Sequence, residues 1–205
     1  MNQIDELVKM AESQIGYKED PKTGYNKYNL AYYGYESAQP WCVVFIWWLC
    51  QQIKAPELFF GGKKTASCGT LYNDYYKPMG MTVPFSQAKR GDWVEFTFNG
   101  VEHCHIGVLK AIDGDYVITI DGNTSDASSN NGGEVLERRR HKSCIYGIIR
   151  PPYKSGSNSV YYTVQPGDTL SKIGKMYHMP WRLIAARNGI KSPYTIYPGQ
   201  VLKIK

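Results

Sequence analysis

The sequence predicts an α+β domain followed by a small module whose elements run in the order β-α-α-β. Apolar residues recur at helical spacing near the N-terminus, whereas residues 91–150 contain short runs with the period of two that strands show. Helices grouped before strands indicate an α+β domain with an antiparallel sheet. We expect this domain over residues 1–152, a Pro-, Gly- and Ser-rich linker over 153–159 and the βααβ module over 160–205.

Two helices are expected in the first domain. Residues 4–16 carry apolar side chains on one face, and Gly16 ends the pattern. The run from Cys42 to Ile53, CVVFIWWLCQQI, is apolar nearly all round, as expected of a buried helix. The residues between these helices are rich in Tyr, Asn, Gly and Pro and predict a loop with room for a turn of helix. A mixture of loop and short helix is expected over residues 56–88.

Strands follow in both parts of the chain. Asn-Gly and Asp-Gly turns separate the first three of the four strands expected in the first domain. These four strands are GDWVEFTF (91–98), HIGVLKAI (105–112), DYVITID (115–121) and CIYGIIR (144–150). The module is expected to contain a strand at 160–164, a helix at 168–177 capped by Asp168 or Thr169, a helix at 180–188 and a strand at 200–205.

Composition and charge narrow the classes of partner. The longest strongly apolar run, Val43 to Leu49, is far shorter than the ~20 residues that span a bilayer, so we expect no membrane insertion. The N-terminal residues lack the apolar region of a signal peptide, which predicts synthesis in the cytoplasm without a signal for export. Residues 151–205 carry eight basic residues and one acidic residue, whereas residues 1–150 have a net charge of −1. Such a basic tail suits nucleic acid, a membrane surface or an anionic bacterial wall.

One of the five cysteines has the position of a nucleophile. The cysteines are scattered, odd in number and without CxxC pairs, which argues against a disulfide framework and against structural zinc. Cys42 stands where a loop becomes a helix, and the unpaired N–H groups and dipole of a helix start stabilise a thiolate. Cys50 is about two turns further along and is interpreted as packing.

A base and its orienting residue are the next requirement of a cysteine nucleophile. His105 heads a predicted strand on whose face Gly107 leaves room beside the imidazole, and His103 is its rival. Asp121 and Asn123 end the next strand two residues apart, so an extended chain directs both side chains the same way. Either residue could fix the His105 tautomer, although Asp-Gly-Asn is also ordinary turn chemistry.

A metal site is not expected. Adjacent residues of a strand point to opposite faces, so the sequence His103-Cys104-His105 suits a single ion poorly. No cofactor is predicted either. The order of a cysteine at a helix start, a histidine on a strand and a polar residue on the next strand is that of papain-like hydrolases.

These residues together resemble a known family. PWCVVFIWW (40–48), GDWVEF (91–96), HIGVL (105–109) and IDGNTS (120–125) are similar, in this order, to the CHAP family of cysteine, histidine-dependent amidohydrolase/peptidases. The resemblance covers roughly residues 4–150 and implies a papain-like fold that hydrolyses amide bonds of peptidoglycan. It implies Cys42 as nucleophile and His105 as base. Asp121 stands where the family often has Glu, and Asn123 matches the polar residue two positions further on.

The acidic calcium loop of some family members has no counterpart here. The approach to the nucleophile, YYGYESAQPWC, holds only Glu36, and the nearest other acids are Glu19 and Asp20. We therefore expect no calcium requirement. Loss of activity in EGTA that calcium restores would contradict this expectation.

The tail resembles a LysM module over about residues 161–205. YYTVQPGDTLSKIGKMY, Asn188-Gly189-Ile190 and the stretch from Tyr197 to Leu202 follow the family pattern. The resemblance implies binding of N-acetylglucosamine-containing glycans between two loops. The residues that it implies are Gly167, Asp168, Thr169, Leu170, Asn188, Gly189 and Ile190. They also have an ordinary structural interpretation, in which Asp168 and Thr169 cap a helix and Ile190 packs.

The sequence as a whole favours a peptidoglycan hydrolase that acts as an N-acetylmuramoyl-L-alanine amidase or as an endopeptidase. Cys42 would attack an amide carbonyl of the wall peptide, and His105 would take the thiol proton and later protonate the leaving amine. The Cys42 N–H would stabilise the oxyanion, with Gln39 a candidate second donor.

A lytic domain with a wall-binding tail and no signal peptide resembles bacteriophage or prophage endolysins, which a membrane-permeabilising partner of the holin type releases to the wall. The alternatives are a host autolysin and a non-catalytic wall-binding protein. Nucleic-acid binding is disfavoured, because the aromatic residues of the tail do not form stacking platforms beside a basic groove.

Overall fold

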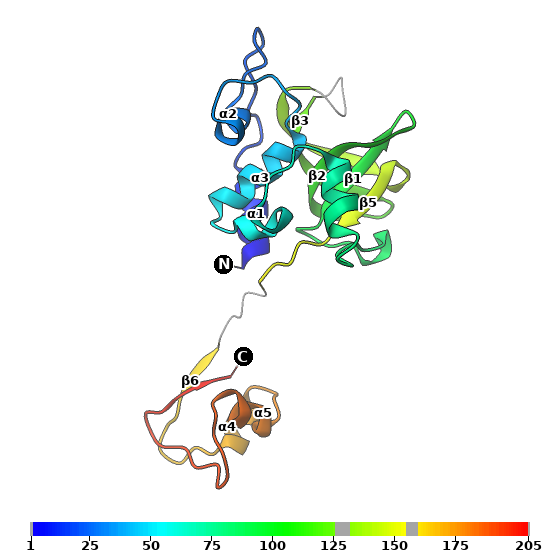
Figure 1. Cartoon of the computed structure of the whole chain (residues 1–205). Helices are drawn as coiled ribbons and strands as arrows, with labels where there is room; N and C mark the ends of the chain where they lie inside the picture. Colours follow the sequence, from blue (N-terminus) through cyan, green and yellow to red (C-terminus); the bar gives the residue numbers. More distant parts are fainter. Residues whose placement is uncertain (1, 126–131, 155–159, 205) are drawn as a thin grey trace. The chain divides into compact units, whose positions relative to one another are not determined.

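The computed structural model describes residues 2–125, 132–154 and 160–204. They form two compact units, the first within Gln3–Lys154 and the second within Ser155–Lys205 (Figure 1). Most of the predicted linker, residues 155–159, lies outside the described residues. Each unit has its own core of buried apolar side chains, and each is described separately below.

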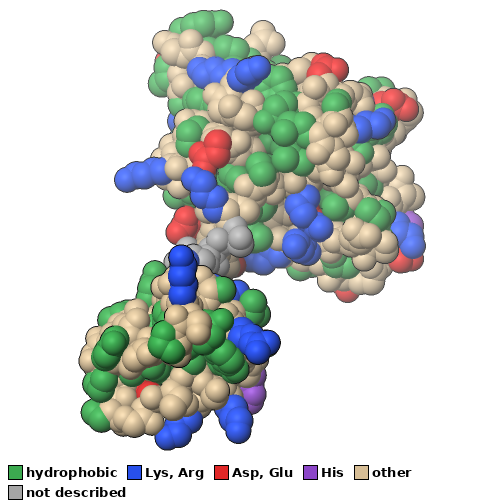
Figure 2. Space-filling model, turned by 60° about the horizontal axis from the view of Figure 1, so that its bottom comes forward, with side chains coloured by type: hydrophobic (Ala, Val, Ile, Leu, Met, Phe, Trp, Pro, Cys, Tyr) green, Lys and Arg blue, Asp and Glu red, His purple; other side chains and the backbone are tan. Residues whose placement is uncertain are grey.

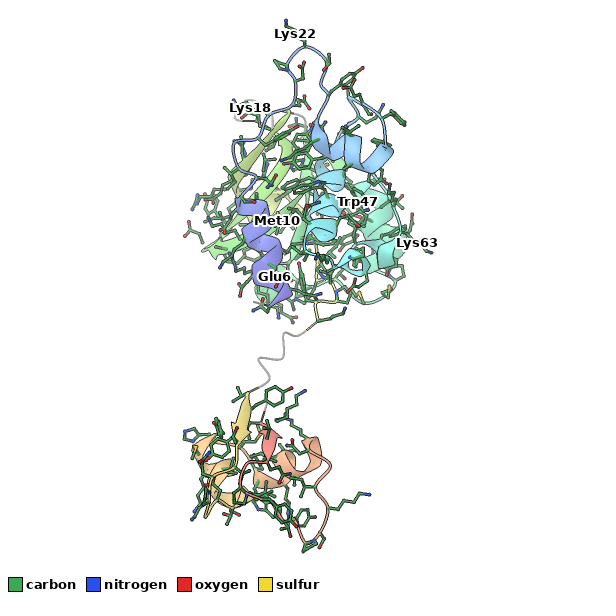
Figure 3. All side chains as sticks on the ribbon, turned by 90° about the vertical axis from the view of Figure 1, so that its left-hand side faces the viewer. Glu6, Met10, Lys18, Lys22, Trp47 and Lys63 are labelled. Atoms are coloured by element: carbon green, nitrogen blue, oxygen red, sulfur yellow. The ribbon has the colours of Figure 1, made fainter. Side chains whose placement is uncertain are left out.

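The first unit begins with three α-helices, as the sequence pattern partly predicts. They are α1 (Gln3–Glu12), α2 (Lys27–Tyr33) and α3 (Cys42–Gln52). Helix α2 is longer than the single turn expected, because the Asn26 side chain caps its first turn and Gly34 ends it in the left-handed conformation. The loop before α2 extends away from the helices and carries Lys22 at its tip (Figure 3). Short helical turns follow α3 within residues 56–88, as expected. They are Pro56–Leu58, Phe60–Gly62, Thr70–Tyr76 and Phe85–Gln87. A further turn, Lys142–Cys144, was not expected.

An antiparallel sheet forms the second layer of this unit. Its strands are β1 (Trp93–Phe98), β2 (Val101–Asp113), β3 (Tyr116–Thr124), β4 (Glu134–His141) and β5 (Ile145–Ile149). Their order across the sheet is β4-β3-β2-β1-β5. Helices α1 and α3 lie on one side of the sheet (Figure 1). This arrangement confirms a mixed fold with an antiparallel sheet.

The expectation of four strands in this unit was wrong, because β4 is a fifth. Its sequence EVLERRRH contains five charged residues, and charged residues are uncommon in strands. The strand lies at the edge of the sheet, where most of its side chains reach solvent and charge is tolerated. Only Val135 and Arg140 of β4 are buried. Such a strand lacks the apolar alternation by which the other four are visible in the sequence.

Helix α3 fills the core between the layers. Eight of its eleven residues are buried, as its all-round apolar sequence predicts. The helix approaches β3 closely at Gly122, where an added Cβ would lie 2.7 Å from Phe45 and from Trp41. A side chain at position 122 would therefore push the helix away from the sheet. The other face of the sheet has a smaller core, which contains Val94, Phe96, Leu109, Val117 and Ile148.

The second unit has the predicted βααβ order. Its elements are β6 (Tyr161–Thr163), α4 (Leu170–Met176), α5 (Trp181–Arg187) and β7 (Val201–Lys203). Strands β6 and β7 pair antiparallel. Thr169 caps α4 by accepting a hydrogen bond from the Lys172 N–H, so of the two caps considered the structure has Thr169. Lys and Arg side chains are spread over the visible face of this unit (Figure 2).

Within residues 2–125, 132–154 and 160–204, no helix is both long and apolar enough to cross a membrane.

Stability of the first unit should depend strongly on α3. Leu49 is wholly buried, and Leu49→Ala is expected to lower the free energy of unfolding by about 2–5 kcal/mol through lost burial and a cavity. Leu30→Ala is the matched control, since Leu30 lies on α2 and is 48% exposed. Urea denaturation followed by circular dichroism measures both variants. Equal destabilisation by the two would contradict the placement of α3 in the core.

Candidate functional site

Cys42 is the first residue of α3 and is almost buried, with 7% of its surface exposed. Two hydrogen bonds hold the segment that precedes Cys42. The Trp41 indole N–H donates to Glu19 Oε2 at 2.8 Å, and Asn29 Nδ2 donates to the Gln39 carbonyl at 2.7 Å. The helix start and its thiol are therefore fixed from both sides. The Gln39 residue itself is exposed.

His105 and Asp121 form a buried pair on neighbouring strands. The distance from His105 Nε2 to Asp121 Oδ2 is 3.0 Å, and both side chains are fully buried. Gly107 makes the pair possible in a way that differs from the expectation. A Cβ at position 107 would lie 1.9 Å from Asp121 Oδ1, so the glycine leaves room for the carboxylate.

The second ring nitrogen of His105 is left for Cys42. Among the described residues Nδ1 has no hydrogen-bond partner, while Nε2 is engaged by Asp121. Cys42 and His105 lie close enough for each to shift the pKa of the other, and Nδ1 is the ring nitrogen that remains for the thiol. Thiol, imidazole and carboxylate thus follow one another in the order that nucleophilic catalysis requires.

The interactions among Cys42, His105 and Asp121 favour a thiolate beside an imidazolium. A hydrogen bond from Cys68, then the hydrogen bond and charge of His105, hold the pKa of Cys42 well below its usual range despite burial. Burial alone would lower the pKa of His105, but the hydrogen bonds to Asp121 and Cys42 raise it to about 9. In contrast, burial raises the pKa of Cys50, which suits its interpretation as packing.

Asn123 does not share the position of Asp121. Its backbone has a φ of 60°, so the chain is no longer extended there, and the expectation that both side chains point the same way was wrong. Its side chain is buried, and Nδ2 has no hydrogen-bond partner among the described residues. Of the two candidate orienting residues, the structure brings only Asp121 to His105.

His103, the rival base, belongs to a different pair, which is partly buried. Its φ of 51° interrupts the strand alternation that would place it beside His105. Its Nδ1 lies 2.6 Å from Glu95 Oε2, and its Nε2 lies 2.9 Å from Asn73 Nδ2. Burial and then the charge of Cys42 raise the pKa of Glu95 to about 9, so this carboxyl is protonated at neutral pH.

Two residues at the site were missed by sequence reasoning. Cys68 precedes a helical turn, and its thiol is the largest influence that lowers the pKa of Cys42. Arg140 of β4 contacts Asp121 Oδ2 through its Nη1 at 2.5 Å. No sequence pattern marks either residue as part of the site, because Cys68 stands in a loop-rich stretch and Arg140 is the last of three consecutive arginines.

No group of three or more His, Cys, Asp or Glu side chains with metal-binding geometry occurs in the described parts of the chain. Glu19 accepts the bond from Trp41, and Asp20 accepts the N–H groups of Lys22 and Thr23 within a turn. The acids nearest the nucleophile thus have structural partners. The absence of a calcium requirement stays a prediction.

Several tail residues implied in glycan binding also stabilise the unit itself. Asp168 Oδ2 accepts from the Tyr162 hydroxyl at 2.7 Å and from the Gln165 N–H at 2.8 Å. The Asn188 side chain pairs with both backbone groups of Lys203 at 2.8 Å. Ile190 packs against the core, and Gly167 and Gly189 have positive φ angles that suit tight turns.

A pocket of about 250 Å³ opens beside the first of the two implied loops. Its lining combines the start of α4 and α5 with the loop before β7. The lining residues are Thr169, Leu170, Ser171, Trp181, Pro193 and Tyr194. The pocket therefore includes two of the implied residues, and residues 188–190 do not line it.

Comparison with known proteins identifies the domain in the C-terminal tail. Residues 162–205 match the LysM domain family, which confirms the expected module. N-acetylmuramoyl-L-alanine amidase sle1 of Staphylococcus aureus is 47% identical over 55 residues, which are 27% of this chain and 16% of that relative. The lipoprotein NlpD/LppB homolog of Pseudomonas aeruginosa is 40% identical over 76 residues, or 37% of this chain and 24% of that relative. The chain thus spans less than a quarter of the length of either protein.

Solved structures give a weaker likeness. Ly7917 is 15% identical with a TM-score of 0.45, and covers 73% of this chain and 62% of its own. The wild-type endolysin LysIME-EF1 is 12% identical with a TM-score of 0.41, and covers 96% of this chain and 91% of its own. Both scores are below 0.5, so neither likeness establishes the fold or the function of this chain.

The low pKa of Cys42 leads to a direct prediction. At pH ~6, where an ordinary thiol is almost fully protonated, iodoacetamide is expected to modify Cys42 before the other four cysteines. Peptide mapping by mass spectrometry after short exposures measures the order of modification. The partly exposed Cys104 and Cys144 are internal controls for access. Faster modification of either control than of Cys42 would contradict the proposed thiolate.

Proposed function

We propose that this protein is a peptidoglycan hydrolase that cleaves an amide bond of the bacterial wall with Cys42 as nucleophile. The observation that carries the proposal is the continuous chain from the Cys42 thiol through His105 to Asp121, at the start of a helix. The LysM domain in the same chain supports the wall as the location of the substrate. The relative sle1 is an N-acetylmuramoyl-L-alanine amidase by name, which is consistent with this substrate class.

The mechanism begins from the thiolate–imidazolium pair. The Cys42 thiolate attacks an amide carbonyl, and the carbonyl electron pair moves to oxygen. The backbone N–H groups at the start of α3 are positioned to stabilise that oxyanion, with Gln39 as the candidate second donor. The His105 imidazolium then gives its proton to the leaving amine, which leaves a thioester on Cys42.

Hydrolysis completes the cycle. Neutral His105 accepts a proton from water, and the resulting hydroxide attacks the thioester carbonyl. The acid product leaves and the thiolate returns. Asp121 keeps the same ring nitrogen protonated throughout and so directs Nδ1 toward the sulfur. The assignment of Asp121 rather than Asn123 as the orienting residue belongs to this proposal.

The tail is proposed to hold the enzyme on wall glycan. Its pocket offers a hydroxyl, Thr169, and aromatic surface from Trp181 and Tyr194, which suit the polar rim and apolar face of an N-acetyl sugar. Its basic surface is attracted to anionic wall polymers. Tethering raises the concentration of peptide bonds near Cys42 without any further contact.

Hydrolysis is tested with purified peptidoglycan and mass spectrometry of the soluble products. The wild type is expected to release peptide-free glycan if it is an amidase, or cut peptides still attached to sugar if it is an endopeptidase. Cys42→Ala should release nothing, whereas Cys144→Ser should act like the wild type. A wild type that releases nothing would indicate a non-catalytic wall-binding protein, and a Cys42→Ala variant that releases as much as an active wild type would indicate a hydrolase of another kind.

Glycan binding is tested in the Cys42→Ala background, which leaves the substrate intact. Tyr194→Asn removes an aromatic wall of the pocket, and asparagine tolerates the positive φ at this position. The fraction that sediments with insoluble peptidoglycan is expected to fall several-fold. Tyr197→Asn is the matched control, since Tyr197 is 67% exposed and outside the pocket lining. No loss with Tyr194→Asn would indicate charge-driven binding without a glycan pocket, and an equal loss with both variants would contradict a binding site confined to this pocket.

A further inference from the structure

Arg140 is a buried cation behind the candidate catalytic residues. Arg140 lies on the edge strand β4, yet only 7% of its surface is exposed. Its Nη1 lies 2.5 Å from Asp121 Oδ2 and 3.3 Å from Thr119 Oγ1. Its guanidinium carbon lies 4.7 Å from the ring centre of Phe96 and 5.4 Å from that of Phe98. The side chain is therefore held by an anion, a hydroxyl and two aromatic rings.

Asp121 depends on this cation. Burial alone would favour the protonated carboxyl, but the charge of Arg140 and then the bond to His105 keep the pKa of Asp121 below its usual value. The same oxygen, Oδ2, receives both Arg140 Nη1 and His105 Nε2. The guanidinium thus fixes the acceptor that orients the imidazole.

Arg140 also balances the charges of the other three groups in this site. In the active form, the buried chain contains a thiolate at Cys42, an imidazolium at His105, a carboxylate at Asp121 and a guanidinium at Arg140, which sum to zero. Without the guanidinium the chain would carry one uncompensated negative charge in a region of low dielectric constant. Protonation of the Cys42 thiolate would remove this negative charge most directly.

We propose that Arg140 is a positioning residue of this site, which holds Asp121 charged and in place and thereby maintains the Cys42 thiolate. This inference rests on the proposed function and adds a fourth residue to it. Arg140 touches no reacting atom and acts through Asp121. The other titratable groups near the chain are Cys104 on β2, Glu95 on β1 and Cys68 before the helical turn at Thr70–Tyr76.

The test measures the rate of Cys42 alkylation against pH in the full-length protein, together with the rate of peptidoglycan cleavage. Arg140→Gln is expected to move the acid side of the alkylation profile to higher pH and to lower cleavage at pH 7 by about 10- to 100-fold, the range that loss of the outer-shell partners of metal ligands gives. Arg140→Lys retains the charge and should keep the profile near that of the wild type. Arg139→Gln is the matched control, because Arg139 is exposed and pairs with Asp113.

The outcomes separate this inference from the function itself. An alkylation profile that Arg140→Gln leaves unmoved would overturn the role of Arg140, even if cleavage falls. A wild type that cleaves no peptidoglycan would overturn the proposed function while the alkylation profile still decides on Arg140. If Arg140→Gln does not fold, Arg140→Met, which keeps an unbranched side chain without the charge, is measured in its place. An alkylation profile at the position of the wild type would then overturn the inference.

Discussion

The close packing of α3 on β3 is the constraint on which the candidate site depends. At Gly122 the strand backbone approaches Phe45 and Trp41 so closely that no side chain fits between them. This contact sets the depth of the helix, and the helix carries Cys42 at its first residue. The partners of Cys42 come from β2 and β3, so their distance from the thiol depends on the same contact. Protein interiors are densely packed, and a shift of the helix would pass directly to the thiol.

A second constraint is the charge of the buried chain. Ionised groups lose hydration when they are buried, and they persist only with partners of opposite sign. Cys42, His105, Asp121 and Arg140 satisfy this requirement in alternation, with signs −, +, − and +. Gly107 contributes by leaving space for the Asp121 carboxylate, and Cys68 adds a hydrogen bond to the thiolate. The neighbouring Glu95 carboxyl is kept neutral by burial, so it adds no negative charge near the thiolate.

The LysM tail is a very small unit, and its stability needs more than its apolar core. Its apolar core is limited, and side-chain hydrogen bonds to the backbone reinforce it. Asn188 fixes β7, Asp168 fixes the loop after β6, and Thr169 caps α4. Residues of the family pattern therefore have structural roles, and Thr169 and Leu170 also line the pocket.

The sequence by itself determined the elements with clear periodicity and the residues with distinctive chemistry. It located α3, four of the five strands of the sheet, the LysM tail, and Cys42 and His105 as candidates. It could not reveal β4 or Arg140, because a charged edge strand has no apolar alternation and its one buried arginine looks like its exposed neighbours. It could not separate Asp121 from Asn123 either, since their spacing is meaningful only if the chain stays extended. Only the tertiary structure decided these points, because backbone conformation at Asn123 and burial of Arg140 depend on contacts between strands that are distant in the sequence.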